Sequence, residues 1–453
     1  MKSLIFICSP SLAILDSWVS VLYKLKKIYN FPIFILVPQL RTIMEIEKGS
    51  EVITISNRLF EGVIFTKRYG GWRTGKTLLD AVDIAKKTSR LSDFLRLHEI
   101  EIESYLNERN IVGVLYDIQV ESKPYLAKIL PKFKNLPKFS IDHGCGIGSE
   151  VAPSDTLQYL IKKMQRASTE LKPRISQFCR GKPPLDKENA QIIGDRSDVT
   201  VFLYSDLQLS IYTDFKINSG SFRLVGIPRH EPFWINKIVN EINMVIPDGF
   251  RSDYILVVSR PENSTYLPRD RKMEYLRDIK DIAHKLGKKI IVKPHPKESL
   301  HIKRRDDVYK IVLRDETYGL DWMFSSRHIF SLAKNAFFVV YYFSSTSPDF
   351  ANLNVPVVCR ANLNGLPAYD KKGSLRDKFG NVVPTSVALG LSLHAKDKNE
   401  FEEVVWKIIS DRKRIVRAAK ISYNRVFPTI SDINLKIARE IACVRHQRNL
   451  LKQ

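Results

Sequence analysis

Three short motifs contain residue types that could bind a phosphate or move a proton, and each directly follows an apolar run. The first, Lys293-Pro294-His295-Pro296, comes after Ile290-Ile291-Val292. Two prolines stop a strand from continuing its ladder, so the chain turns here and presents Lys293 and His295. An ammonium group and an imidazole suit a phosphate that becomes a leaving group, because both can neutralise its growing charge. The alternative is a rigid turn with a solvated lysine and a structural histidine.

The second motif is rich in hydroxyl groups. Ser344, Ser345 and Thr346, followed by Ser347-Pro348-Asp349, come after the apolar run Ala336–Phe343. Hydroxyl and backbone N–H groups at the start of a helix form an anion site. A helix N-cap alone would need only one of these residues. The run of four hydroxyl side chains therefore predicts phosphate binding in addition to capping.

The third motif lies in the other half of the chain and is rich in glycine. Its sequence, Ile-Asp-His-Gly-Cys-Gly-Ile-Gly, begins at Ile141. Glycines permit unusual backbone angles and the close approach of a ligand, but their spacing here differs from the dinucleotide fingerprint. Asp142 or His143 is a candidate base that would deprotonate an acceptor hydroxyl. The alternative is a glycine-rich turn in which His143 is hydrogen-bonded locally.

Strands alternate with helical stretches in both halves, which is typical of parallel α/β architecture. Helical spacing runs through Leu15 to Leu25, over Leu78–Leu106 and Arg271–Leu286, and from Asn399 to the end. Ligands of open parallel sheets bind beyond the carboxyl ends of strands, which is where the three motifs lie. Apolar runs predict strands at Leu4–Cys8, Phe34–Val37, Gly62–Phe65, Val114–Tyr116, Phe139–Ile141, Val199–Tyr204, Phe222–Val225, Tyr254–Val258, Lys289–Val292, Ala336–Phe343 and Val355–Cys359.

The alternation breaks after Gly226-Ile227-Pro228, so a domain junction is expected there. Arg229–Asp253 contains Pro232, Pro247 and Gly249 and is expected to be irregular. A chain of 453 residues also exceeds the size that one core usually supports. We therefore predict two Rossmann-like domains facing a cleft, an acceptor domain at 1–235 and a donor-nucleotide domain at 250–400. Helices at 401–453 are expected to pack back across both domains.

The composition predicts an anionic partner. The formal net charge is +23, with 72 basic and 49 acidic residues. No zinc-finger, RNP or KH-like signature occurs, so a membrane lipid or an anionic glycan is favoured over nucleic acid. A basic run with interleaved apolar residues predicts an amphipathic surface that contacts the inner membrane, although an ordinary solvated helix would look similar. Its basic members are Lys162, Lys163, Arg166, Lys172, Arg174, Arg180 and Lys182.

The cysteines and apolar segments favour a cytoplasmic location. The five cysteines are widely spaced and form no CxxC pair, so neither a zinc nor a redox site is predicted. Asp16 interrupts the apolar N-terminus, which argues against a signal peptide, and no apolar run reaches the ~18 residues of a membrane span. No Asp-x-Asp motif occurs. We expect no metal and no cofactor.

The order of the motifs resembles that of bacterial polysaccharide enzymes that use cytidine-activated donors. These include capsule biosynthesis transferases, Kdo transferases, polysialyltransferases and the CDP-glycerol phosphotransferases of teichoic acid synthesis. A strand with His143-Gly144, a strand with Lys293–Pro296 and a strand with Ser344–Thr346 follow each other as they do in these enzymes. The resemblance covers most of Val114–Arg360, and the tandem domains look like the GT-B architecture of many glycosyltransferases.

The resemblance implies roles for particular residues. His295 resembles the residue that contacts the donor phosphate, and Ser344, Ser345 and Thr346 look like its serine-rich partner. Asp142 matches the first acid of the D/E-D/E-G pattern in sialyl-polymerising members, with His143 in place of the second. The His143-Gly144 pair is also similar to the HG motif of the glycerophosphate transferases, so the base stays open between Asp142 and His143.

Further positions are similar to relatives on weaker motifs. Gly226-Ile227-Pro228 looks like the G-x-P turn that ends the first domain in these enzymes. Ser259 and Arg260 follow the first strand of the second domain, where relatives often line the nucleotide site.

The activity that this resemblance implies is a metal-independent glycosyltransferase. It would move a sugar such as Kdo or another ulosonic acid from a CMP-activated donor to a bacterial surface polysaccharide or lipopolysaccharide acceptor. One alternative is a CDP-polyol phosphotransferase of capsule or teichoic-type polymers. A second is a UDP-sugar 2-epimerase, which shares the two-domain fold, and a third is a non-enzymatic basic assembly protein of a polysaccharide export complex.

Overall fold

The computed structural model describes most of both halves of the chain. The described residues are 2–8, 12–38, 50–66, 72–87, 100, 102–117, 130–133, 135–141, 196–209, 219–241, 246–263, 267–295, 298, 307–367, 369–370 and 374–450.

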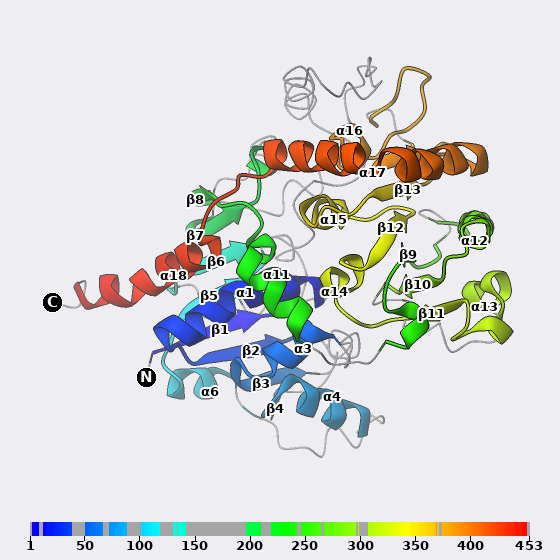
Figure 1. The fold of residues 1–453 in the computed structure, drawn as a ribbon. Coiled ribbons are helices and arrows are strands. Elements are labelled where there is room, and N and C mark those ends of the chain that lie inside the picture. The colour runs from blue at the N-terminus through cyan, green and yellow to red at the C-terminus, as the bar shows by residue number, and fades with distance from the viewer. Residues whose placement is uncertain are drawn as a thin grey trace.

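These residues form two sheets of mostly parallel strands, which confirms the predicted α/β class (Figure 1). The first sheet has the order β4-β3-β2-β1-β5-β6-β7-β8, and only β4 runs antiparallel to its neighbour. Its strands are β1 (Ser3–Ile7), β2 (Ile33–Val37), β3 (Phe60–Thr66), β4 (Trp72–Gly75), β5 (Ile111–Tyr116), β6 (Lys138–Ile141), β7 (Arg196–Leu203) and β8 (Ser219–Leu224). We call this sheet with its helices the N-terminal lobe.

The second sheet is parallel throughout its described strands and has the order β11-β10-β9-β12-β13-β14. Its strands are β9 (Tyr254–Val258), β10 (Ile290–Lys293), β11 (Trp322–Phe324), β12 (Ala336–Tyr341), β13 (Val357–Arg360) and β14 (Leu393–Ala395). Strands β1, β2 and β9 are buried along their whole length, as expected for parallel strands that helices cover on both faces. We call this sheet with its helices the C-terminal lobe.

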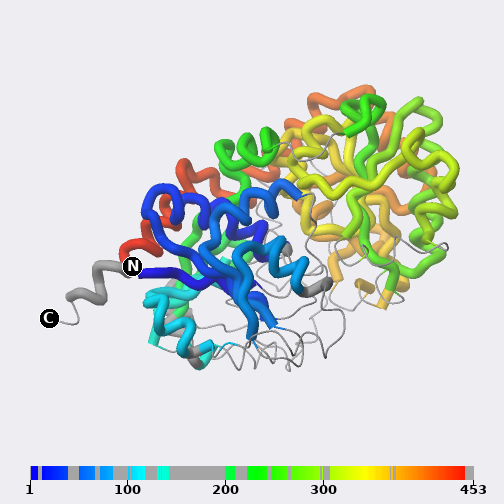
Figure 2. The backbone as a smooth tube through the Cα atoms, turned by 90° about the horizontal axis from the view of Figure 1, so that it is seen from below, coloured from blue at the N-terminus to red at the C-terminus, as the bar shows by residue number. Residues whose placement is uncertain are grey.

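Helices connect and cover the strands. In the N-terminal lobe these are α1 (Leu12–Tyr29), α3 (Glu51–Ser56), α4 (Leu78–Lys87) and α6 (Ile102–Glu108). In the C-terminal lobe they are α12 (Arg269–Lys285), α13 (Val308–Leu313), α14 (Ile329–Ala333), α15 (Ser347–Asn352) and α16 (Thr385–Ala388). Two further helices, α17 (Lys398–Val426) and α18 (Ile433–Leu450), follow. Figure 2 shows α17 on the C-terminal lobe and α18 returning, in red, along the N-terminal lobe, where it packs on α1.

The segment between the lobes differs from the prediction. Arg229–Asp253 was expected to be irregular, but a 3-10 turn, η4 (Pro228–His230), is followed by α11 (Pro232–Asn240). The prediction was wrong because Pro232 occupies the first turn of α11, where a missing N–H costs nothing and the fixed φ suits a helix. Trp234 and Ile238 then bury one face of this helix.

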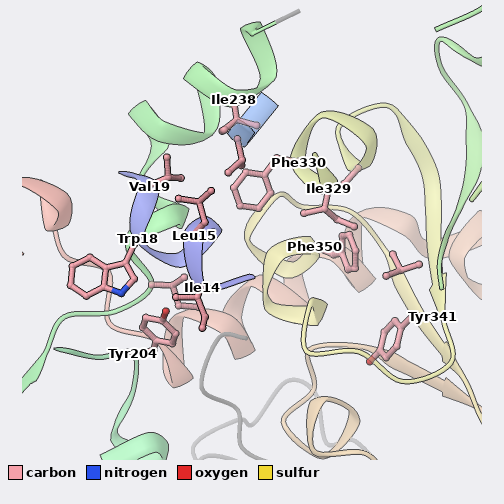
Figure 3. Close-up of a cluster of buried hydrophobic side chains, with 14 of the residues drawn as sticks. Ile14, Leu15, Trp18, Val19, Tyr204, Ile238, Ile329, Phe330, Tyr341 and Phe350 are labelled. Carbon is pink, nitrogen blue, oxygen red and sulfur yellow. The ribbon is translucent and has the colours of Figure 1, made fainter. Parts of the chain in front are cut away.

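The cores of the two lobes are joined at this junction. Figure 3 shows Leu15 and Val19 of α1 near Phe330 of α14 and Ile238 of α11. All four side chains are buried and belong to one continuous hydrophobic cluster. The lobes are therefore held by apolar packing as well as by the polar contacts described below.

Candidate active site

Three of the loops singled out in the sequence emerge at one edge of the second sheet. Val258 at the end of β9 is in register with Lys293 of β10 on one side and with Tyr341 of β12 on the other. Because the strands are parallel, Arg260, the Lys293–His295 turn and the Ser344–Thr346 loop all follow carboxyl ends at this edge. The strand order reverses between β9 and β12, and ligands of such sheets bind outside the point of reversal.

The hydroxyl loop lies directly after β12. The Ser344 and Thr346 hydroxyls are 2.9 Å apart, and the Thr346 backbone N–H donates to Ser344 Oγ at 3.3 Å. Ser345 is exposed and its two neighbours are half-buried, so the loop lies at the surface. The Thr346 side chain makes no cap hydrogen bond to α15. The loop therefore offers more hydroxyl groups than the helix start uses.

A cation from the neighbouring strand lies against this loop. Arg260 Nη1 donates to the Phe343 carbonyl at 3.3 Å, and the guanidinium lies 5.2 Å from the centre of the Phe343 ring. Arg260 is half-buried. These contacts hold a positive charge beside the hydroxyl groups at the point where the strand order reverses.

The Lys293–His295 turn is fixed on both sides. Lys293 Nζ donates to the Ser326 carbonyl at 2.9 Å, and the His295 backbone N–H donates to Glu298 Oε2 at 2.7 Å. Both side chains are half-buried. The turn thus places an ammonium group and an imidazole at the same sheet edge as Arg260.

Glu298 is a residue that the sequence reasoning missed. Its side chain is buried, and it accepts from Lys272 Nζ at 2.5 Å and from the Tyr309 hydroxyl at 3.1 Å, in addition to the His295 amide. Burial, followed by the charge of Glu298, raises the pKa of Tyr309 well above its usual range, so the phenol keeps its proton and donates. Only the position of Glu298 soon after Pro296 could have drawn attention to it.

Ser259 belongs to the same buried cluster. Its hydroxyl donates to Glu298 at 2.8 Å and also contacts the Tyr309 hydroxyl, and its side chain is buried. The structure therefore gives Ser259 a part in holding the β9 and β10 loops together. Its expected contact with a nucleotide stays a prediction.

Asp142 and His143 lie outside the described residues. The strand that precedes them, β6, ends at Ile141 and pairs with β5 and β7. The basic run between Lys162 and Lys182 also lies outside the described part of the chain. The base and the membrane contact stay predictions.

The carboxyl edges of the two sheets meet at one place in the described chain. Asp16 near the start of α1 and Glu51 at the start of α3 belong to the N-terminal lobe. Asp16 accepts from Arg229 and, at 2.9 Å, from His328 Nε2. Glu51 accepts from the His328 backbone N–H at 2.6 Å and from Arg327 Nε at 3.0 Å. Because these helices and the loop after β11 all start at carboxyl ends of strands, the two edges face each other here.

Two groups at this junction have shifted pKa values. Burial opposes the charge on Asp16, but the charges and hydrogen bonds of His328 and Arg229 outweigh burial and hold its pKa well below the usual range. Burial lowers the pKa of His230, and the hydrogen bond to Asp349 offsets this only in part. Asp16 is therefore a carboxylate and His230 a neutral imidazole at neutral pH.

Within the described residues, no group of three or more His, Cys, Asp or Glu side chains could hold a metal ion. The described helices also include none that is long and apolar enough to cross a membrane.

Comparison with solved structures identifies the architecture. The chain is similar to S. aureus MnaA in its complex with UDP, with a TM-score of 0.54 and 11% identity over 98% of this chain and 97% of that chain. The chain has the GT-B fold. A variant of the wall teichoic acid polymerase TagF gives a TM-score of 0.52 at 11% identity, over 100% of this chain and 90% of that chain. The UDP-GlcNAc 2-epimerase of Neisseria meningitidis bound to UDP-GlcNAc gives 0.52 at 12% identity, over 97% and 99%.

These similarities concern the fold. No protein-family model matches the chain, and no curated protein matches its sequence. At identities of 11–12% the structural matches establish two Rossmann-like lobes of the GT-B type and leave the activity to be argued from the site.

Proposed function

We propose that this protein is a glycosyltransferase-type enzyme that binds the phosphate of a nucleotide-activated donor at the carboxyl edge of the second sheet. One observation carries the proposal. The adjacent strands β9, β10 and β12 carry Arg260, Lys293 and the Ser344–Thr346 hydroxyls at or just after their carboxyl ends, where the strand order reverses. Cationic groups and hydroxyls together suit an anion, and this position in the fold suits a nucleotide.

The proposed chemistry is group transfer with a nucleotide phosphate as the leaving group. Lys293, His295 and the hydroxyl groups would stabilise the negative charge that grows on this phosphate as the bond to the sugar breaks. Asp142 or His143, which follow β6 in the facing lobe, would take the proton from the acceptor hydroxyl. Glu298 supports this arrangement, because it fixes the backbone of His295 in the buried cluster.

The resemblance of the motifs to cytidine-dependent enzymes supports a CMP-linked donor, with Kdo or another ulosonic acid as the sugar. The acceptor would be a bacterial surface polysaccharide or lipopolysaccharide, in keeping with the net charge of +23, and the enzyme would contact the inner membrane through its basic residues. Transfer of a polyol phosphate from a CDP-polyol would use the same phosphate site and differ in the bond that breaks.

The test is a panel of CMP-, CDP- and UDP-linked donors incubated with the purified chain, with nucleotide release followed in the presence and absence of glycan acceptors. Release of CMP that depends on acceptor supports the proposal. A glycoside product indicates sugar transfer, and a phosphodiester product indicates polyol-phosphate transfer.

Two outcomes would contradict the proposal. Conversion of a UDP-sugar to another UDP-sugar without acceptor would indicate a 2-epimerase, an activity named for one of the structural neighbours. If calorimetry showed no donor binding while anionic vesicles bound well, the chain would be an assembly protein of polysaccharide export.

A further inference from the structure

Arg229 connects the two lobes through a pair of carboxylates. Its Nη1 donates to Asp16 of α1 in the N-terminal lobe. Its Nη2 lies 2.8 Å from Oδ1 and 2.9 Å from Oδ2 of Asp349 in the C-terminal lobe. Arg229 is only 9% exposed and Asp349 is fully buried. A planar guanidinium can engage two carboxylates with fixed geometry, which the point charge of a lysine cannot do.

Asp349 lies in the short helix that begins directly after the hydroxyl loop. Helix α15 spans six residues, with Thr346 as its N-cap. A helix this short is not stable by itself, so its position depends on tertiary contacts. Because Ser344–Thr346 connects β12 to α15, any movement of α15 moves the hydroxyl groups.

Besides packing on β13, α15 has polar contacts with η4, the turn between the lobes, and with α17. His230 Nε2 donates to Asp349 Oδ1 at 2.5 Å, and the Tyr423 hydroxyl donates to His230 Nδ1 at 2.7 Å. At the far end, Lys420 Nζ donates to the Asn352 carbonyl at 3.2 Å and to its side-chain oxygen at 2.8 Å. The contact through Arg229 leads on to a charged partner in the N-terminal lobe, Asp16.

We infer that Arg229 is a positioning residue. Through Asp349 it holds the hydroxyl loop of the donor site in position, and through Asp16 it makes the geometry of this loop depend on how the N-terminal lobe packs against the C-terminal lobe. The inference rests on the proposed function for the identity of the bound group. Removing one member of a buried ion network leaves an uncompensated buried charge, which is strongly destabilising. A partly formed network is therefore unfavourable, and the three side chains should pair together or not at all. The donor site is then complete only when the lobe that carries the acceptor base is in place.

The chain contains a matched control for this idea. Glu51 is also a buried carboxylate of the N-terminal lobe that crosses the same junction. Its partners, Arg327 and the His328 backbone, lead into α14 alone, whereas Asp16 reaches α14 through the His328 side chain and α15 through Arg229. Loss of its charge should loosen the junction without reaching the hydroxyl loop directly.

The experiment compares Asp16→Asn with Glu51→Gln in the full chain. Amide hydrogen exchange is measured over residues 342–353 and 326–333, and affinity for CMP, CDP and UDP is measured by calorimetry. We expect Asp16→Asn to speed exchange at 342–353 by about tenfold and to weaken nucleotide binding about fivefold or more. Glu51→Gln should affect 326–333 and leave both 342–353 and nucleotide affinity close to wild type.

Either of two exchange results would overturn the inference: unchanged exchange at 342–353 in Asp16→Asn, or equal changes there in both variants. If Asp16→Asn does not fold, Arg229→Lys serves in its place, because an ammonium group cannot hold both carboxylates. If the wild-type chain binds none of the nucleotides while the exchange contrast persists, the proposed function fails and the positioning of α15 by Arg229 stands. If nucleotides bind equally well to wild type and Asp16→Asn, the function stands and the inference fails.

Discussion

Replacing Gly226 by alanine tests how closely the start of the turn between the lobes packs against the C-terminal helices. Gly226 has φ +81°, and a Cβ added there would lie 2.5 Å from the Pro428 carbonyl oxygen. Pro428 lies in the segment that connects α17 to α18. A left-handed backbone costs an alanine about 1–2 kcal/mol. Displacing a packed backbone carbonyl adds about 1–3 kcal/mol, so Gly226→Ala should lower the free energy of unfolding by about 2–5 kcal/mol in all.

Gly287→Ala separates the two contributions. Gly287 has φ +61°, and nothing lies within 4 Å of its added Cβ. This variant should therefore show the backbone cost alone, about 1–2 kcal/mol. The difference between the variants measures the cost of displacing the Pro428 carbonyl, which lies close to the turn that leads into Arg229.

The assay is denaturant unfolding followed by tryptophan fluorescence and circular dichroism. Trp18 and Trp234 are buried near the junction and report its opening. Hydrogen exchange in α18 shows in addition whether this helix detaches from the N-terminal lobe. Equal destabilisation by Gly226→Ala and Gly287→Ala, with α18 unchanged, would refute the steric part of the reasoning.

Three further predictions concern the site and the junction. His295→Ala should lower turnover by about 100-fold or more with an unchanged melting temperature, because we propose that its half-buried imidazole stabilises the leaving phosphate, and near-normal turnover would remove that role. Glu298→Gln should cost about 3–5 kcal/mol by leaving Lys272 buried without its counterion, and adding Lys272→Met should recover much of this in denaturant titrations. Failure of that recovery would show that the pair is not the source of the loss. Burial lowers the pKa of His230, so below about pH 6.5 the unfolded chain binds a proton that the folded chain does not. The free energy of unfolding should therefore decrease as the pH is lowered. His230→Gln should remove this part of the pH dependence between pH 7.5 and 5.5, and an unchanged dependence would contradict the assignment.

Strands that are buried on both faces were the most predictable elements. Tyr254–Val258 was predicted with the same bounds as β9, because a strand covered by helices on both sides is a continuous apolar run. The strands Trp322–Phe324 and Leu393–Ala395 were not predicted, since three residues are too few to show a pattern. Proline was the misleading signal, because at Pro232 it begins a helix.

The residue types at the carboxyl edge of the second sheet were also available from the sequence. Lys293, His295 and Ser344–Thr346 follow predicted apolar strands, and the fold shows in addition that β9, β10 and β12 are neighbours with aligned carboxyl ends. The sequence could not show that the Ser259 side chain is hydrogen-bonded to Glu298 inside a buried cluster. This cluster forms only because helices α12 and α13 pack against the same strand ends and bring Lys272 and Tyr309 to Glu298.

By itself, then, the sequence determined the α/β class and which side chains emerge beyond the strands, since both follow from local apolar runs and the turns that end them. Only the tertiary structure decided that Arg229 meets Asp16, 213 positions away, and Asp349, 120 positions away. A charged residue carries no local signal of its distant partner, because pairing depends on how whole lobes pack and not on neighbouring residues. The contact between the lobes, and the control of the hydroxyl loop that we infer from it, therefore became visible only in the folded chain.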